Sequence, residues 1–223
     1  MVRSMHASRW LGGVLLTLCC AVLAGCSLGV MAGKMFTGDP LLPAQFKSMT
    51  GTDLTKRTHR IVVVCSTPTA VDADLSGLNL DLIDGITRRM KVHGIHVISP
   101  DKVAKWIDDN GGVVTDPSEM ANAFDADYVA WVEVYGFSLR EDQSPKLLRG
   151  RSQGFVRVYE VKKLDEGKVA LAAFNSEFTM TYPQHQPISE TGRSALLFQK
   201  EFVDRVCEEL AEKFYDHRPG TGI

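Results

Sequence analysis

The spacing of apolar positions changes along the chain, and each spacing predicts a different kind of element. Residues 61–65 form a continuous, mostly β-branched run, which is typical of a strand covered on both faces. From residue 78 to residue 93 an apolar side chain recurs every three or four positions, so this segment predicts a helix that ends at Gly94. Shorter patterns predict three further elements, a strand at 95–99 and helices at 100–109 and 117–124.

The second half of the chain predicts longer strands and a final helix. Residues 128–137 alternate and predict a strand, whereas the polar stretch 139–154 predicts a loop. Two runs, 155–163 and 169–182, flank a turn that contains Gly167 and predict a hairpin. The last pattern, at 195–215, has one apolar and one charged side and predicts a helix that packs on the sheet.

One arm of the predicted hairpin has an apolar side and a polar side, so one face of the sheet meets solvent or a partner. The apolar side consists of Ala170, Ala172, Phe174, Phe178, Met180 and Tyr182. The polar side consists of Asn175, Glu177, Thr179 and Thr181. We predict that these four polar residues, together with the loop at 139–154, contact a partner.

The order of elements predicts an α/β (α+β) domain. We expect a mixed sheet of about five strands, with helices mainly on one face and an amphipathic C-terminal helix. This domain spans residues 59–217, and residues 218–223 form a disordered tail.

The first 25 residues predict a secretory signal peptide. Arg3 and Arg9 precede an apolar run of about 14 residues, which is too short to span a bilayer core of roughly 30 Å. The run ends in Leu23-Ala24-Gly25-Cys26, which resembles the bacterial lipobox. This resemblance implies cleavage between Gly25 and Cys26 and a diacylglycerol, with palmitate, on Cys26. The alternatives are an ordinary signal peptide with a chance cysteine and an uncleaved anchor.

A lipid on Cys26 would anchor the chain in a membrane of the cell envelope. Residues 26–58 are rich in small and polar residues and predict a flexible tether, although Phe46 and Met49 suit packing on the domain or on a partner. Ser27 follows the cysteine, where an Asp often signals inner-membrane retention in the lipoproteins that the lipobox resembles. We therefore expect a protein of the outer membrane that faces the periplasm.

Charge and cysteine content narrow the chemistry further. Lys and Arg number 25 and Asp and Glu number 27, a net charge of −2 that gives no reason to expect nucleic-acid binding. Beyond residue 26 the cysteines are Cys65 and Cys207. Their positions in an apolar strand and a helix favour small buried hydrophobic residues, and a disulfide between them is the alternative.

Three motifs carry weak chemical signals. Gly150, Ser152 and Gly154 match the G-x-S-x-G pattern of serine hydrolases, but that chemistry needs a strand before the serine and a helix after it. A strand is predicted after Ser152, so we expect no catalytic residue here. A calcium loop starting at Asp72 would need an acid at Ile83.

The remaining motifs favour neither a metal nor a cofactor. His93 and His96 lack a third ligand nearby, so we expect no metal site. The sequence contains no phosphate-binding or dinucleotide-binding motif, so we expect no cofactor.

Short segments of the predicted domain resemble one family of envelope proteins. These segments are Ile98-Ser99-Pro100 before a helix, residues 124–129 before a strand, and the hairpin 155–161 with its turn at Gly167. They resemble the domain shared by curli-secretion-type lipoproteins, the TolB amino-terminal domain and lipoproteins that activate penicillin-binding proteins. Residues 130–133 lack the glycine that this family often has there, and the resemblance assigns no functional residue.

These expectations favour a non-enzymatic function. A membrane-anchored lipoprotein of this kind would bind an envelope protein and help to assemble a secretion, transport or cell-wall complex. One alternative is a homo-oligomeric secretion-channel subunit, although no hairpin shows a long apolar outer band. The other is an envelope hydrolase that uses Ser152.

Overall fold

The structure is a computed structural model, and it describes residues 40–68, 75, 77–112, 114–165 and 167–218. The domain spans Pro43–His217. The signal peptide, Cys26, Asp72 and Asp74 lie outside the described residues. Ile83, where a calcium loop would need an acid, lies within a helix that has Gly77 as its N-cap.

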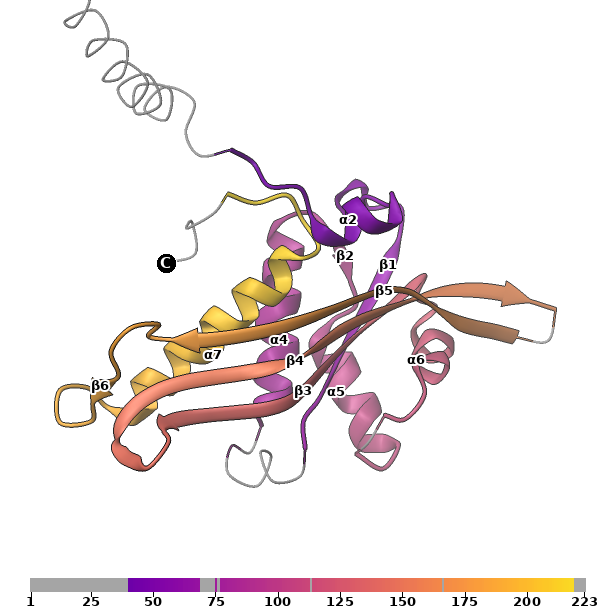
Figure 1. Cartoon of the computed structure of the whole chain (residues 1–223). Helices are drawn as coiled ribbons and strands as arrows, with labels where there is room; N and C mark the ends of the chain where they lie inside the picture. Colours follow the sequence, from indigo (N-terminus) through magenta and orange to yellow (C-terminus); the bar gives the residue numbers. More distant parts are fainter. Residues whose placement is uncertain (1–39, 69–74, 76, 113, 166, 219–223) are drawn as a thin grey trace, which may run out of the picture. The chain divides into compact units, whose positions relative to one another are not determined.

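The domain contains a six-stranded sheet with the strand order β2-β1-β3-β4-β5, and β6 pairs with β4 (Figure 1). The strands are β1 (Arg60–Ser66), β2 (His96–Val97), β3 (Tyr128–Glu141), β4 (Ser144–Leu164), β5 (Gly167–Tyr182) and β6 (Ile188–Ser189). The helices are α2 (Gln45–Thr50), η1 (Leu54–Lys56), α4 (Leu78–Val92), α5 (Pro100–Asp109), α6 (Pro117–Phe124) and α7 (Ala195–Glu212). The α/β class and the mixed sheet are therefore as predicted.

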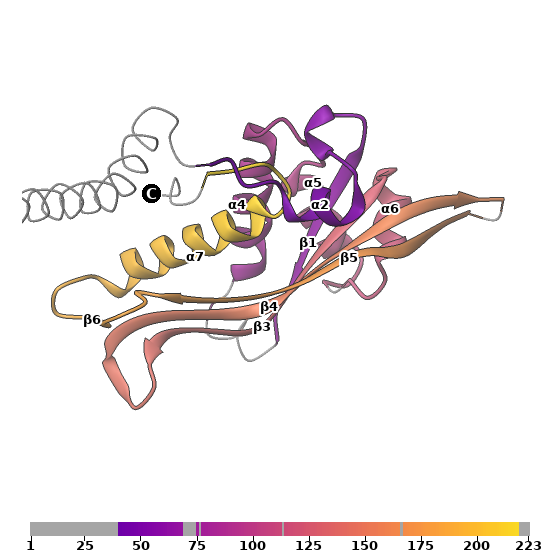
Figure 2. The same ribbon diagram turned by 45° about the horizontal axis from the view of Figure 1, so that its top comes forward.

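The two ends of the sheet differ in strand direction. β1 pairs in parallel with β2 and β3, whereas β3, β4 and β5 are antiparallel. Both faces of β1 are buried, because α4 lies on one side and α5 and α6 contact the strands from the other. Figure 2 shows β3, β4 and β5 continuing beyond β1 alongside α7.

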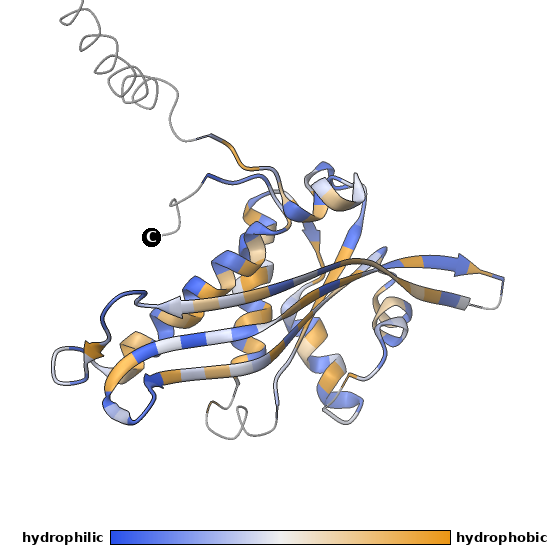
Figure 3. Cartoon of the chain, in the orientation of Figure 1, coloured by the Kyte–Doolittle hydropathy of each residue, from blue (hydrophilic) through white to orange (hydrophobic). Residues whose placement is uncertain are grey.

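The core lies on both sides of β1, with α4 and α7 on one side and Val103 of α5 and Met120 of α6 on the other. Phe202 packs under Gly150 of β4, and its ring centroid is 5.2 Å from that of Phe137. Figure 3 shows the apolar stripes of α4 and α7, whose outer positions are polar. Arg89 of α4 joins the helices through ion pairs with Asp204, at 2.7 Å, and with Glu208 of α7.

The helices agree closely with the predicted bounds because their ends carry strong local signals. Pro100 and Pro117 stand in the first turns of α5 and α6, where the missing N–H of proline costs nothing. Gly94 follows α4 with a φ of +83°, a conformation that favours glycine. The predicted strand at 95–99 is shorter in the structure and covers only His96–Val97.

The loop predicted at 139–154 is wrong. β3 continues to Glu141, the chain turns at Asp142 and Gln143, and β4 begins at Ser144. Charged side chains connect the two strands of this ribbon, and the stretch is therefore polar. Glu141 accepts hydrogen bonds from Arg149, at 3.0 Å, and from Arg151. Apolar alternation, on which the prediction depended, is therefore weak in this ribbon.

The predicted apolar side of β5 is correct from Phe174 onward and wrong before it. Val158 of β4 pairs with Phe174 but Tyr159 pairs with Ala172, so the intervening Ala173 forms a bulge. One extra residue moves every earlier side chain to the opposite face, and Ala170 and Ala172 accordingly lie on the other face.

The tether prediction is wrong for the part that precedes β1 in the domain. Residues 45–50 form α2, and Phe46 and Leu54 are buried in the core. The ring of Phe46 lies 5.6 Å from that of Tyr128, edge to face. The backbone N–H of Phe46 also donates to the carbonyl of Lys213, so this segment is fastened to the end of α7.

Candidate functional site

No described element covers one face of the antiparallel strands, and we call it the open sheet face. It consists of Glu133, Tyr135, Gln153, Phe155, Arg157, Asn175, Glu177 and Thr179. The strand register places these side chains in rows, since Glu133, Phe155 and Glu177 are direct neighbours across β3, β4 and β5. The alternate residues of the same strands point toward α7 and α2 and are buried.

The polar positions predicted on β5 are part of this face. Asn175, Glu177 and Thr179 are exposed, and Thr181 is half-buried beside them. The structure therefore brings the predicted residues to one surface, although their contact with a partner stays a prediction.

The centre of the open sheet face is aromatic, which the sequence analysis missed. The ring of Tyr135 lies 5.6 Å from that of Phe155, and the guanidinium of Arg157 lies 5.1 Å from the Phe155 ring centroid. Tyr135 remains 41% exposed. An aromatic pair beside an arginine is the composition in which protein interfaces are enriched.

Hydrogen bonds hold these side chains in place. Arg157 pairs with Glu133, and the Tyr135 hydroxyl donates to the Glu177 carboxylate at 3.1 Å. Partial desolvation and this hydrogen bond raise the pKa of Tyr135, so the hydroxyl stays protonated and donates. The aromatic centre is therefore preorganised, which lowers the entropy that binding must overcome.

A small hollow lies at one end of the open sheet face. Its volume is about 260 Å³, and Gly136, Gln153 and Thr179 contribute to its lining. A broad face with a shallow hollow suits contact with a macromolecule better than enclosure of a small substrate, which needs a deeper pocket.

Ser152 lies inside the sheet and not on a nucleophile turn. It is 1% exposed in the middle of β4, and its hydroxyl has no hydrogen-bond partner among the described residues. The flanking glycines have packing reasons, because a Cβ at Gly150 would lie 2.4 Å from the Phe202 ring and one at Gly154 would lie 2.1 Å from the carbonyl oxygen of Glu133. The G-x-S-x-G match therefore reflects a strand whose two glycines leave room for close neighbours, and not a catalytic turn.

His93 and His96, for which no metal site was expected, lie in different elements of the fold. The His93 ring stacks on Tyr215 with centroids 3.6 Å apart, and His96 lies on β2. The described part of the chain contains no group of three or more metal-ligating side chains. Nor does any described helix have the length and hydropathy to cross a membrane.

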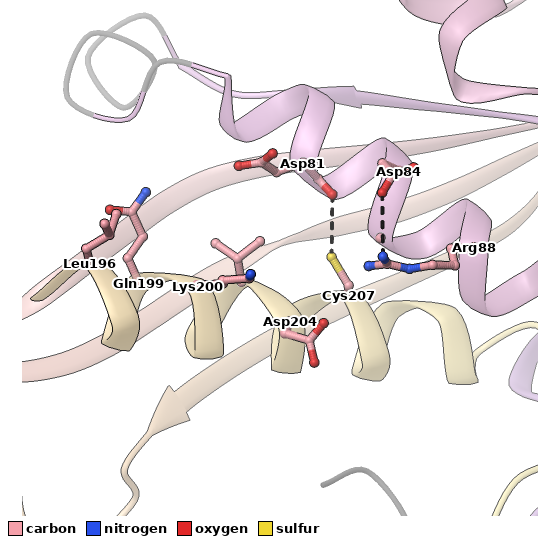
Figure 4. Close-up of a pocket in the computed structure, with 10 residues that line it drawn as sticks. Asp81, Asp84, Arg88, Leu196, Gln199, Lys200, Asp204 and Cys207 are labelled. Atoms are coloured by element: carbon pink, nitrogen blue, oxygen red, sulfur yellow. Dashed lines mark hydrogen bonds and ion pairs between the residues drawn. The ribbon is translucent and has the colours of Figure 1, made fainter. Parts of the chain in front are cut away.

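Cys65 and Cys207 are free and buried in the structure. Burial raises the pKa of the Cys207 thiol to about 12, so this thiol stays protonated and unreactive near neutral pH. Cys207 lies at the bottom of a groove of about 390 Å³ between α4 and α7 (Figure 4). Asp81, Asp84 and Arg88 of α4 line this groove, and a Cβ at Gly85 would lie 2.5 Å from the Cys207 sulfur.

Comparisons with known proteins find distant structural likenesses. No family model matches the chain, and no curated protein matches it. The chain is similar to the crystal structure of lipoprotein GNA1162 from Neisseria meningitidis, with 14% identity, a TM-score of 0.38, and coverage of 69% of this chain and 96% of that one.

Two further solved structures are similar at the same level. A PelC dodecamer from Paraburkholderia phytofirmans has 11% identity, a TM-score of 0.40, and coverage of 74% of this chain and 94% of that one. Protein XCC0632 from Xanthomonas campestris has 12% identity, a TM-score of 0.44, and coverage of 78% and 89%. Likenesses this distant carry no argument about function.

Proposed function

We propose that this chain is a lipid-anchored component of the bacterial cell envelope that binds a protein partner without catalysing a reaction. The observation that carries the proposal is the open sheet face, an uncovered surface with an aromatic centre and fixed ion pairs. The lipobox-like Leu23-Ala24-Gly25-Cys26 supports the anchoring, with the domain facing the periplasm from the outer membrane.

A non-enzymatic role suits the chemistry of the described residues. The carboxylates on the open sheet face are engaged by Arg157 and Tyr135, and Ser152 is enclosed without a general base beside it. A bound protein would cover the Tyr135–Phe155 pair, and the charges around the pair would set the orientation of the partner.

The test is crosslinking in cells with the full-length protein, carrying a photoreactive residue at the exposed position Gln153. Affinity capture of wild-type protein should recover an envelope protein in stoichiometric amount. The substitution Glu177→Lys reverses a charge in the centre of the face and should reduce capture by at least about tenfold. Glu119→Lys, the same change at an exposed position of α6, is the matched control and should leave capture unchanged.

Three outcomes would contradict the proposal. Equal capture of the partner by wild type and Glu177→Lys would show that the open sheet face is not the binding surface. Recovery of only copies of the same chain would favour a homo-oligomer, such as a channel subunit, over binding to a different protein. Ester hydrolysis by the wild type that Ser152→Ala abolishes would establish the hydrolase instead.

The lipid anchor is tested separately. Cys26→Ser should abolish incorporation of a palmitate analogue and move the protein from the membrane fraction to the soluble fraction. Continued labelling of this variant would place the acyl chain elsewhere.

A further inference from the structure

A second cavity lies at the carboxyl end of β1, away from the open sheet face. Its volume is about 480 Å³, within the range of about 300–1,000 Å³ that is usual for small-molecule sites. Ser66 and Thr67 come from the end of β1, Asn79 from the first turn of α4, Asp108 from α5 and Trp131 from β3.

The position of this cavity follows from the topology of the sheet. From β1 the chain passes through α4 to β2 on one side, and then through α5 and α6 to β3 on the other. The carboxyl end of β1 is therefore a point where the strand order reverses, between the start of α4 and α5 (Figure 1). In open sheets with parallel strands such a point forms a crevice that is suited to ligands.

Two polar atoms of the lining are buried without a partner. Neither the hydroxyl oxygen of Thr67 nor the side-chain carbonyl oxygen of Asn79 has a hydrogen-bond partner among the described residues. Buried polar atoms are nearly always paired, so a pair of unpaired atoms in one cavity calls for an explanation. Both oxygens have almost no accessible surface, so each side chain must rotate slightly to reach a bound hydroxyl group, which both donates and accepts.

The rest of the lining limits the charge of the ligand. No Lys or Arg belongs to the described lining, and the Asp108 carboxylate disfavours an anion. Asp108 is the one carboxylate of the described lining and is exposed, so water and salt screen its attraction for a cation. The polar part of the cavity therefore fits a neutral ligand.

The apolar part of the lining fits the carbon skeleton of such a ligand. Leu80, Ile107 and Val114 line the cavity with the indole of Trp131. The indole N–H donates to the Ser66 hydroxyl at 3.1 Å, which fixes the ring and leaves the Ser66 hydrogen free to donate. A flat aromatic and aliphatic wall beside several hydroxyl partners matches a sugar ring, which has C–H faces and an equatorial belt of hydroxyl groups.

We propose that this cavity binds a neutral sugar, a mono- or disaccharide held by Thr67, Asn79 and Asp108 against Trp131. The site is separate from the open sheet face, and its existence does not depend on the proposed protein partner.

The test is isothermal titration calorimetry of the full-length protein in a detergent without a sugar headgroup. The probes are glucose, N-acetylglucosamine and its β-1,4-linked dimer, with inorganic phosphate as the anionic probe. At least one sugar should bind saturably and change the tryptophan fluorescence, and phosphate should not bind.

Matched variants locate the site. Asn79→Leu should weaken sugar binding by at least tenfold, and the nearly isosteric Thr67→Val should weaken it several-fold while keeping the fold. Asn175→Leu, the same change on the open sheet face, should leave binding unchanged. Thermal unfolding of each variant shows that the domain is intact.

Absence of saturable binding to all three sugars would overturn the proposal, as would binding of phosphate in their place. Sugar binding with the same affinity in Thr67→Val and Asn79→Leu would also overturn it, because the ligand would then occupy another surface.

Discussion

At the β2-β1-β3 end of the sheet the strands are parallel and helices cover both faces, whereas at the β3-β4-β5 end the strands are antiparallel and one face is open. Val62 and Glu177 lie on the same side of the sheet, yet Val62 is completely buried and Glu177 is exposed. The difference arises from the connections, because a parallel pair needs a crossover that brings helices across the sheet and a hairpin does not. The antiparallel end is therefore free to carry a binding surface.

The largest expected effect comes from placing the same charge at both ends. Val62→Lys buries an unpaired ammonium group between β1 and the helices, so the domain should fail to fold or lose several kcal/mol of its free energy of unfolding. Glu177→Lys should change this free energy by no more than about 0.5 kcal/mol. Urea unfolding followed by circular dichroism measures both, and equal losses in the two variants would show that the open sheet face is covered in the folded protein.

A smaller effect is expected from a methyl group inside the antiparallel end. Gly154→Ala places a Cβ 2.1 Å from the Glu133 carbonyl oxygen, so the backbone must shift, and the free energy of unfolding should fall by about 1–3 kcal/mol. Gly192→Ala meets its nearest atom at 3.5 Å and is the control, with an expected change within about 0.5 kcal/mol. A Gly154→Ala variant as stable as wild type would show that β3 and β4 separate at Gly154 with little cost in free energy.

The smallest effect is local and depends on pH. Hydrogen bonds from Arg149 and Arg151 hold the pKa of Glu141 below its usual value of 4.5. A lowered carboxyl pKa stabilises the fold above the unfolded pKa, and this stabilisation is lost as the pH falls through the folded pKa. Between about pH 5 and pH 3, amides at 138–149 should therefore lose hydrogen-exchange protection, corrected for intrinsic rates, while those at 61–65 keep theirs.

The variant Glu141→Gln isolates this contribution. It should show the weaker protection at 138–149 already at neutral pH and little further change on acidification. Identical pH profiles for the variant and the wild type would assign the acid response to other groups, such as the Arg140–Glu190 pair.

The sequence predicts the helices well because their ends are marked locally. Asp116 accepts from the backbone N–H of Ser118 at the start of α6, and Gly94 ends α4. The burial of β1 could also be predicted, because a short run with apolar residues on both faces fits a covered parallel strand.

The features that the sequence did not predict depend on pairing between strands. The bulges at Tyr135 and Ala173 appear only when β3 and β5 are placed in register with β4. The candidate site was consequently predicted in part: the alternation of β5 indicated Glu177 and its neighbours, but the register brings Phe155 and Arg157 beside them. The sequence did not predict the strands within 139–154, because ion pairs there take the place of apolar alternation.

The fastening of α2 to the end of α7 sets the point at which a force on the chain first meets the domain. Ala44 donates its backbone N–H to Asp216 at 2.9 Å, and Lys47 pairs with the same carboxylate at 3.0 Å. A pull on the chain from its N-terminal side reaches this junction before it reaches any strand of the sheet. We therefore expect tension from that side to load these two contacts before it loads β1.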